Sequence, residues 1–231
     1  MAVTDEAIEK IKAMILSGTL KPGARLPKEP DLAAELGLSR SSLREAVKAL
    51  SLLNVLDVRQ GDGTYVSSLE PALLLEALTF ILDLQRDESV LELLQVRAIL
   101  EPAAAALAAQ RMTDDQVAEL RSNLDDLGDN PAVEALVAAD LEFHARIAAA
   151  AGNSVLSSLI DSLAARTARA RIWRGLTQES AVAQTIAEHR ALLDAIAAHD
   201  VEAARAVATV HITGVAQWLR RAQTSGYWVS R

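Results

Sequence analysis

Residues 26–50 read LPKEPDLAAELGLSRSSLREAVKAL, and this stretch decides how the N-terminal part of the chain folds. Two segments with apolar side chains at helical spacing lie on either side of Gly37, and glycine commonly ends a helix. Ser39 can cap the second segment, which we expect to continue to about Leu53. Two helices of about seven and 14 residues joined around a glycine are typical of a helix-turn-helix.

A further helix and a hairpin flank this motif. Residues 5–16 place apolar side chains at helical spacing and predict one short amphipathic helix. Two short strands, expected at 56–59 and 64–67, enclose the sequence Gln60-Gly61-Asp62-Gly63, in which Asp-Gly is a strong hairpin signal. Three helices and a hairpin predict a winged helix-turn-helix domain over residues 1–67.

The predicted second helix of the motif carries a cationic face. Arg40, Arg44 and Lys48 are spaced four residues apart and form one stripe on that helix. A solvated helix face is one interpretation of this stripe, and contact with the bases or phosphates of DNA is the other. Serine hydroxyls and free backbone N–H groups at the helix start could also bind phosphate. The serines concerned are Ser39, Ser41 and Ser42.

The net charge of −8 is distributed unevenly along the 231 residues. Residues 1–66 hold nine Lys+Arg and nine Asp+Glu, so all of the excess negative charge lies in the rest of the chain. The less acidic N-terminal part is therefore the better suited to approach a polyanion.

Composition also excludes several classes of protein. The chain has no cysteine, which excludes a disulfide framework, a thiolate nucleophile and a cysteine-ligated metal. The most apolar run, at 71–84, contains Glu76 and Asp83 and is shorter than the roughly 20 residues of a membrane helix. We therefore expect a soluble, cytoplasmic protein with no membrane span.

Every segment beyond a short linker at residues 68–71 has helical periodicity. Short connections make successive helices antiparallel neighbours, so residues 72–231 should form an all-α bundle. Glycine, proline and capping residues mark the boundaries of seven predicted helices. These helices are expected at about 71–84, 88–110, 113–127, 131–151, 153–174, 178–198 and 200–224.

Three of the four histidines can converge with one aspartate. Asp140 and His144 are i, i+4 neighbours and point from one helix face. His189 precedes the predicted turn at 199–200 by about ten residues and His211 follows it by about 11, so both lie roughly 15 to 17 Å from it. One carboxylate and three imidazoles suit zinc, and also nickel, manganese or iron. A surface Asp–His pair with two unrelated histidines fits the spacing equally well.

The N-terminal sequence resembles the winged helix-turn-helix of the GntR family of bacterial transcription regulators. The resemblance covers about residues 5–67 and includes the Ser-Arg start of the recognition helix, the Arg-Glu-Ala that follows and the Gly-x-Gly-Thr wing. It implies a recognition helix in the DNA major groove and a wing tip in the adjacent minor groove. Pro30 stands where many members carry arginine, which puts one expected contact in doubt. The implied DNA contacts are Ser39, Arg40, Ser41, Ser42 and Arg44, with Gln60 and Gly61 at the wing tip.

A second resemblance, over roughly residues 71–224, is to the FCD ligand-binding domain of the FadR subfamily. In metal-containing members an Asp and three His hold a divalent ion, and the ion receives a small carboxylate effector or water. By this resemblance Arg97 would clamp the effector carboxylate, although an i, i+4 ion pair with Glu101 is the alternative. Asn153 is either an effector contact or a helix N-cap. The motif is carried by Glu92-x4-Arg97-x3-Glu101-Pro, by Asp140 and His144, by Gly152-Asn153 and by Glu188-His189 and His211.

Four arginines of the bundle form a basic run, for which a solvated helix face is the default expectation and a position facing the cavity is the alternative for one of them. The run consists of Arg166, Arg169, Arg171 and Arg174.

Together these features predict a homodimeric DNA-binding regulator that responds to a small carboxylate and reads an approximate inverted repeat. A metal-dependent enzyme is one alternative, because open positions on such a metal could activate water. However, no separate acid or base stands at a telling spacing, and we expect no enzymatic activity. A purely structural metal is the other alternative.

Replacing Arg44 with alanine should weaken operator binding strongly. A good arginine–base contact contributes about 1–3 kcal/mol, so the variant should lose about tenfold or more in affinity. A gel-shift titration at fixed salt measures this loss, and an unaltered affinity would refute the assignment of Arg44.

Overall fold

The computed structural model describes residues 3–73 and 89–225. The chain divides into two compact units, Met1–Leu78 and Thr79–Arg231, and each is described here by itself. No helix in the described part of the chain is long and apolar enough to cross a membrane.

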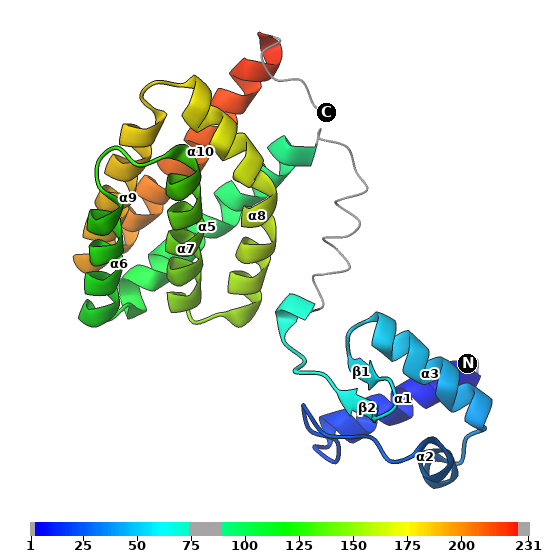
Figure 1. The fold of residues 1–231 in the computed structure, drawn as a ribbon. Helices are drawn as coiled ribbons and strands as arrows, with labels where there is room; N and C mark the ends of the chain where they lie inside the picture. The colour runs from blue at the N-terminus through cyan, green and yellow to red at the C-terminus, as the bar shows by residue number, and fades with distance from the viewer. Residues whose placement is uncertain (1–2, 74–88, 226–231) are drawn as a thin grey trace. The chain divides into compact units, whose positions relative to one another are not determined.

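The N-terminal unit is a winged helix-turn-helix, as the sequence predicts (Figure 1). Helix α2 ends at Gly37, which has a left-handed φ of 63°. Its backbone N–H donates to the carbonyls of Ala33 and Ala34 in α2. Ser39 caps α3, and its side chain accepts a hydrogen bond from the Ser42 N–H. The elements are α1 (Val3–Leu16), α2 (Glu29–Leu36), α3 (Arg40–Leu52), β1 (Leu56–Arg59) and β2 (Gly63–Val66).

Helix α3 buries one face and exposes the other. Leu43, Ala46 and Leu50 are buried against a core that includes Ile11 of α1. Val47 is partly buried and packs against the same core. The opposite face, with the three cations, is exposed to solvent.

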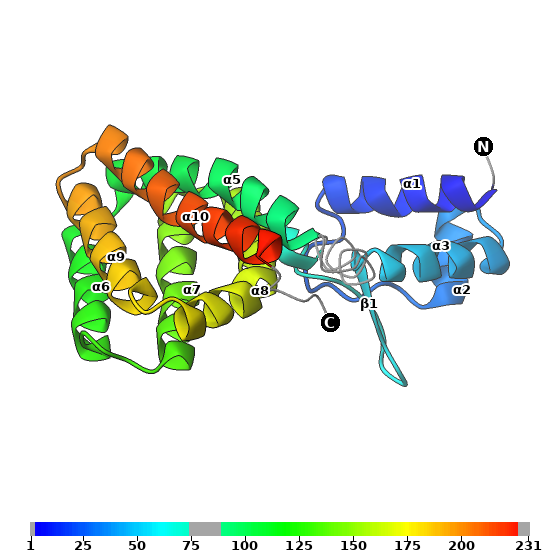
Figure 2. The same cartoon turned by 90° about the horizontal axis from the view of Figure 1, so that it is seen from above.

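The wing is fastened to the segment that precedes α2. The strands β1 and β2 are antiparallel, and the hairpin projects beyond the three helices (Figure 2). Leu26 donates a backbone hydrogen bond to Thr64, and Val66 donates one to Ala24. The Arg25 guanidinium crosses Gly63 and donates a hydrogen bond to the Asp62 carbonyl. A Cβ at Gly63 would lie 2.7 Å from Arg25 Nε. The absence of a side chain at Gly63 therefore leaves room for this crossing.

The C-terminal unit is a helical bundle. Helices α5 and α10 run alongside each other and pack together most extensively (Figure 2). Six of the seven predicted helices are found in residues 89–225, whereas the predicted helix at 71–84 lies outside the described residues beyond residue 73. The bundle consists of α5 (Ser89–Arg111), α6 (Asp114–Leu127), α7 (Val133–Ala150), α8 (Ser154–Thr177), α9 (Ala181–Ala197) and α10 (Val201–Thr224).

Side-chain caps set several of the bundle's helix starts. Thr113 and Gln116 form a reciprocal capping box at α6, and the Asp200 carboxylate accepts from the Ala203 N–H at α10. Small side chains let the helices approach closely, since Ala104, Ala108 and many other alanines are fully buried. The bundle also buries a set of charged and imidazole side chains, which form the candidate site.

Leu43→Ala should destabilise the N-terminal unit by about 2–5 kcal/mol, because the side chain is 1% exposed and its loss leaves a cavity. Leu52→Ala, on the same helix but 82% exposed, is the matched control and should change stability by about 0.5 kcal/mol or less. Urea unfolding of both variants measures the difference. Equal effects would contradict the assigned orientation of α3.

Candidate metal centre and nucleic-acid interface

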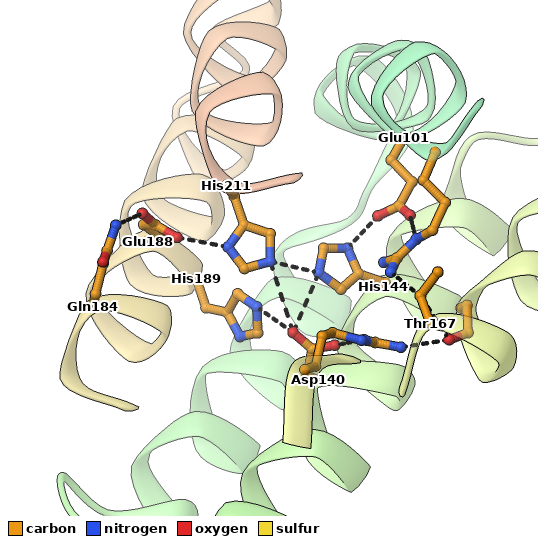
Figure 3. A network of polar contacts seen from close by, with 11 residues as sticks. Glu101, Asp140, His144, Thr167, Gln184, Glu188, His189 and His211 are labelled. Atoms are coloured by element: carbon orange, nitrogen blue, oxygen red, sulfur yellow. Dashed lines mark hydrogen bonds and ion pairs between the residues drawn. The ribbon is translucent and has the colours of Figure 1, made fainter. Parts of the chain in front are cut away.

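Four side chains from three helices meet inside the C-terminal unit. Asp140 and His144 come from α7, His189 from α9 and His211 from α10. One ligand atom from each lies within 4.8 Å of every other, and all four residues are at most 4% exposed. Figure 3 shows the three imidazoles around the Asp140 carboxylate. His189 of α9 and His211 of α10, which the helical rise per residue places at the same height of the hairpin, lie close together.

The distances between ligand atoms match a coordination sphere. Asp140 Oδ1 lies 3.2 Å from His189 Nε2 and 3.7 Å from the Nε2 atoms of both His144 and His211. The Nε2 atoms of His144 and His211 are 3.1 Å apart. Ligands about 2.0–2.1 Å from a tetrahedral zinc ion are about 3.3 Å from one another. Four of the six pairs of ligand atoms are therefore spaced much as they would be around a single small cation.

Two glutamates orient two of the imidazoles. Glu101 Oε2 faces His144 Nδ1 at 2.9 Å, and Glu188 Oε2 faces His211 Nδ1 at 2.8 Å (Figure 3). A carboxylate at Nδ1 favours the proton on that nitrogen and turns the lone pair of Nε2 inward.

The centre of the cluster is consequently rich in acceptor atoms. The inward Nε2 atoms of His144 and His211 and the Asp140 oxygen are all acceptors under this assignment, and buried His189 Nε2 makes no hydrogen bond. Acceptors gathered in a buried site repel one another unless a cation lies between them. The four residues could therefore hold a divalent metal ion.

Burial keeps the histidines in the form that binds metal. Desolvation lowers the pKa of His144, and it lowers the pKa of His189 further, with His211 and His144 adding to the effect. Both imidazoles are therefore neutral at pH 7 and retain a lone pair.

The orienting glutamates are ionised. Burial raises the pKa of Glu101, but the charge of Arg97 and the contact with His144 outweigh burial and hold that pKa well below its usual range. Burial also opposes ionisation of Glu188, whose pKa is nevertheless lowered by its hydrogen bond with His211. Both glutamates can therefore accept the Nδ1 protons of their histidines.

Two buried arginines complete the network. Arg171 donates to Asp140 Oδ2 and to the Ala164 carbonyl, which leaves Asp140 Oδ1 for the centre of the cluster. Burial lowers the pKa of Arg171 to about 9, so its guanidinium stays protonated at neutral pH. Arg97 pairs with Glu101 and donates to Thr167. This ion pair is the alternative that the i, i+4 spacing predicted for Arg97.

A cavity of about 20 Å³ lies beside the cluster, which is room for about one water molecule. Asp140 and His211 form part of its wall, together with buried Arg171 and Arg174. Gly175 also lines it and packs so closely on the start of α7 that a Cβ there would lie 2.6 Å from Val133 Cγ1. The cavity thus has a cationic side that faces the metal ligands.

The solvated face expected for the basic run is wrong for Arg171 and Arg174, which are 7% and 4% exposed. Arg171 and Arg174 share a helix face with Leu163, Ala164 and Ala170, all of which are buried. Helical periodicity in the sequence therefore indicates that these two arginines are buried. Arg97 does not line the cavity.

The remaining predicted contacts of the bundle lie elsewhere. The Asn153 side chain caps α8 by accepting from the Leu156 N–H. His199 lies just beyond the end of α9, where its Nδ1 contacts the Ala109 carbonyl at 2.7 Å. Neither residue belongs to the cluster of metal ligands.

The predicted DNA contacts gather on α3 and the wing of the N-terminal unit. Arg44 pairs with Glu29 of α2, and Lys48 pairs with Glu45 within α3. Arg40 is exposed and has no ion pair within residues 3–73 and 89–225. Exposed Ser39 and Ser41 and half-buried Ser42 form the hydroxyl cluster at the start of α3, while Gln60 and Gly61 are exposed at the hairpin turn.

Comparison with known proteins decides the family. Residues 3–66 match the model of the bacterial regulatory proteins of the gntR family, and residues 92–214 match the FCD domain. The chain belongs to the GntR family. The FCD domain places it in the FadR subfamily, as the two resemblances implied.

Relatives of similar length support this assignment. The transcriptional regulator LutR of Bacillus subtilis is 34% identical over 93% of this chain and 98% of its own length. The galactonate operon transcriptional repressor of Escherichia coli is 30% identical over 94% of this chain and 96% of its own. A solved structure of Streptococcus agalactiae GntR is 31% identical, covers 93% of this chain and 99% of its own, and superposes with a TM-score of 0.65. The chain is therefore a DNA-binding transcriptional regulator.

His189→Ala should abolish retention of zinc at neutral pH, because it removes one of four ligands from a buried site. Glu188→Gln should weaken zinc binding by about ten- to 100-fold, since Glu188 orients His211. His199→Asn, outside the cluster, is the control and should bind as the wild type does. Metal analysis after dialysis and zinc titration measure both effects. Equal zinc retention by all three variants would contradict the site.

Proposed function

We propose that this regulator releases or recruits DNA in response to a small carboxylate effector bound at a divalent-metal site. The metal ligands would be Asp140, His144, His189 and His211. The observation that carries the proposal is the convergence of their four buried ligand atoms.

Zinc is the ion we propose. Imidazole and carboxylate ligands suit zinc, and the absence of sulfur ligands leaves nickel, manganese and iron as acceptable substitutes. The metal would supply a positive centre for the effector. The chain's own part is to hold the four ligands in place through Glu101, Glu188 and Arg171.

The effector we propose is a small hydroxycarboxylate. Its carboxylate would complement Arg171 and Arg174 on the cavity wall, since guanidinium binds carboxylate through paired hydrogen bonds. Two relatives support the class by their names, one a galactonate operon repressor and one a regulator of an L-lactate dehydrogenase operon. Arg97, which is paired with Glu101, would act on the metal ligands through Glu101 and not on the effector.

Effector binding would have to change the bundle. A cavity of about 20 Å³ admits one water but not a hydroxycarboxylate, so side chains or helices around Asp140 and Arg171 would move. Such a movement gives the effector different affinities for two conformations, which is the requirement for control of DNA binding. By linkage, operator DNA must change effector affinity by the same factor.

We further propose that the protein binds DNA as a homodimer. Two winged units would read the halves of an approximate inverted repeat, with half-site centres about 34–36 Å apart or a multiple of that distance. In each unit the contacts would come from α3, through Ser39, Arg40, Ser41, Ser42, Arg44 and Lys48, and from the wing tip, through Gln60 and Gly61.

A thermal-shift screen of small hydroxycarboxylates on zinc-loaded protein tests the effector site. An effector at 100 times its Kd should stabilise the protein by about 2.7 kcal/mol. The stabilisation should disappear in His189→Ala and persist in His199→Asn.

Titration of the same acid with and without operator DNA tests control of DNA binding. Unequal affinities are expected, and equal affinities would contradict the proposal. A purely structural metal would instead show unfolding on chelation with no response to any acid.

A further inference from the structure

An ion pair joins the two helices of the helix-turn-helix. Arg44 of α3 donates from Nη2 to Glu29 Oε1 at 2.7 Å and from Nε to Oε2 at 3.4 Å. Glu29 is the first residue of α2, so the contact crosses from one helix to the other. Both carboxylate oxygens are thus engaged with one edge of the guanidinium.

The contact is exposed and adds little to stability. The Arg44 side chain is 61% exposed and that of Glu29 is 37% exposed. Exposed ion pairs are screened by water and salt and contribute little to the free energy of folding. The pair is also unlike Lys48–Glu45, which lies within a single helix turn, because it links two elements. The main effect of the Glu29–Arg44 ion pair is therefore on the direction in which the Arg44 side chain points.

The geometry leaves the other edge of the guanidinium open. With Nε and one N–H of Nη2 directed at Glu29, one N–H of Nη1 and the second N–H of Nη2 form a parallel fork. Such a fork matches O6 and N7 of guanine in the major groove. An arginine already fixed in this direction loses less conformational freedom when it meets a base.

The position of Glu29 is itself well defined. Pro30 occupies the first turn of α2, where its fixed φ suits the helix, and backbone N–H groups of Asp31 and Leu32 bond to the Lys28 carbonyl. Pro30 also carries no charge that could compete with Arg44 for the carboxylate. The residue that departs from the usual pattern of the family thus favours the Glu29–Arg44 pair.

We propose that Glu29 is a positioning residue for base recognition, which orients Arg44 so that it reads a guanine in each half-site. The proposal rests on the DNA contact of Arg44 put forward above. It assigns to Glu29 a role in specificity although its charge opposes DNA binding.

The charge of Glu29 makes the role testable. A carboxylate near DNA repels phosphates, so its neutralisation should strengthen sequence-independent binding. Loss of an oriented arginine should weaken binding to the preferred sequence. The two effects have opposite signs. The ratio of the affinity for the preferred sequence to the affinity for other sequences therefore separates orientation of Arg44 from simple charge repulsion.

The experiment uses the full-length protein and DNA selected by the wild type from a random-sequence duplex pool. Affinities for the selected duplex and for a scrambled duplex of equal length and composition are measured at fixed salt. Glu29→Gln should lower the ratio of selected to scrambled affinity by about two- to fivefold, and a repeated selection should show less guanine at one position of each half-site. Glu45→Gln is the matched control, since it removes the same charge from the partner of Lys48, and it should leave the ratio unchanged.

A parallel rise of both affinities in Glu29→Gln, as in Glu45→Gln, would overturn the proposal. Arg44→Ala separates this failure from failure of the underlying contact. If Arg44→Ala weakens selection but Glu29→Gln leaves the ratio unchanged, only the role of Glu29 is overturned. If Arg44→Ala also leaves selection intact, the DNA contact itself is overturned. Thermal unfolding of each variant verifies that the winged unit remains folded.

Discussion

The C-terminal unit is organised around a buried charge problem. Asp140 and three imidazoles present ligand atoms to one buried point, and such a gathering of polar atoms costs free energy unless it is compensated. The surrounding ion pairs follow from this constraint. Arg171 neutralises one oxygen of Asp140, while Glu101 and Glu188 direct the imidazole protons outward. The site therefore extends over two layers of side chains, and α5 and α8 belong to it as much as the helices that carry the ligands.

The sequence predicted those parts of the fold that depend on local chemistry. Gly37 and Ser39 end one helix and begin the next because their backbone and hydroxyl groups act on adjacent residues. The level placement of His189 and His211 followed from the constant rise of two antiparallel helices. The helix-turn-helix, the hairpin and six helices of the bundle were accessible in this way.

Other features could not be predicted because they depend on contacts between distant helices. Nothing near Arg171 in the sequence shows that Asp140, 31 residues away, is its partner. Glu101 and Arg97 look like an ordinary i, i+4 pair, and the additional contact of Glu101 with His144 requires α5 to pack on α7.

The close approach of Gly175 to Val133 has a consequence for the size of the cavity in the bundle. The two residues form the packing contact between α8 and the start of α7, and both line the cavity beside Asp140 and His211. A larger residue at one position demands a smaller one at the other, so the pair sets the width of the cavity while the charged groups stay fixed. Paired exchanges at these two positions would change the room beside Asp140 and His211 without altering those side chains themselves.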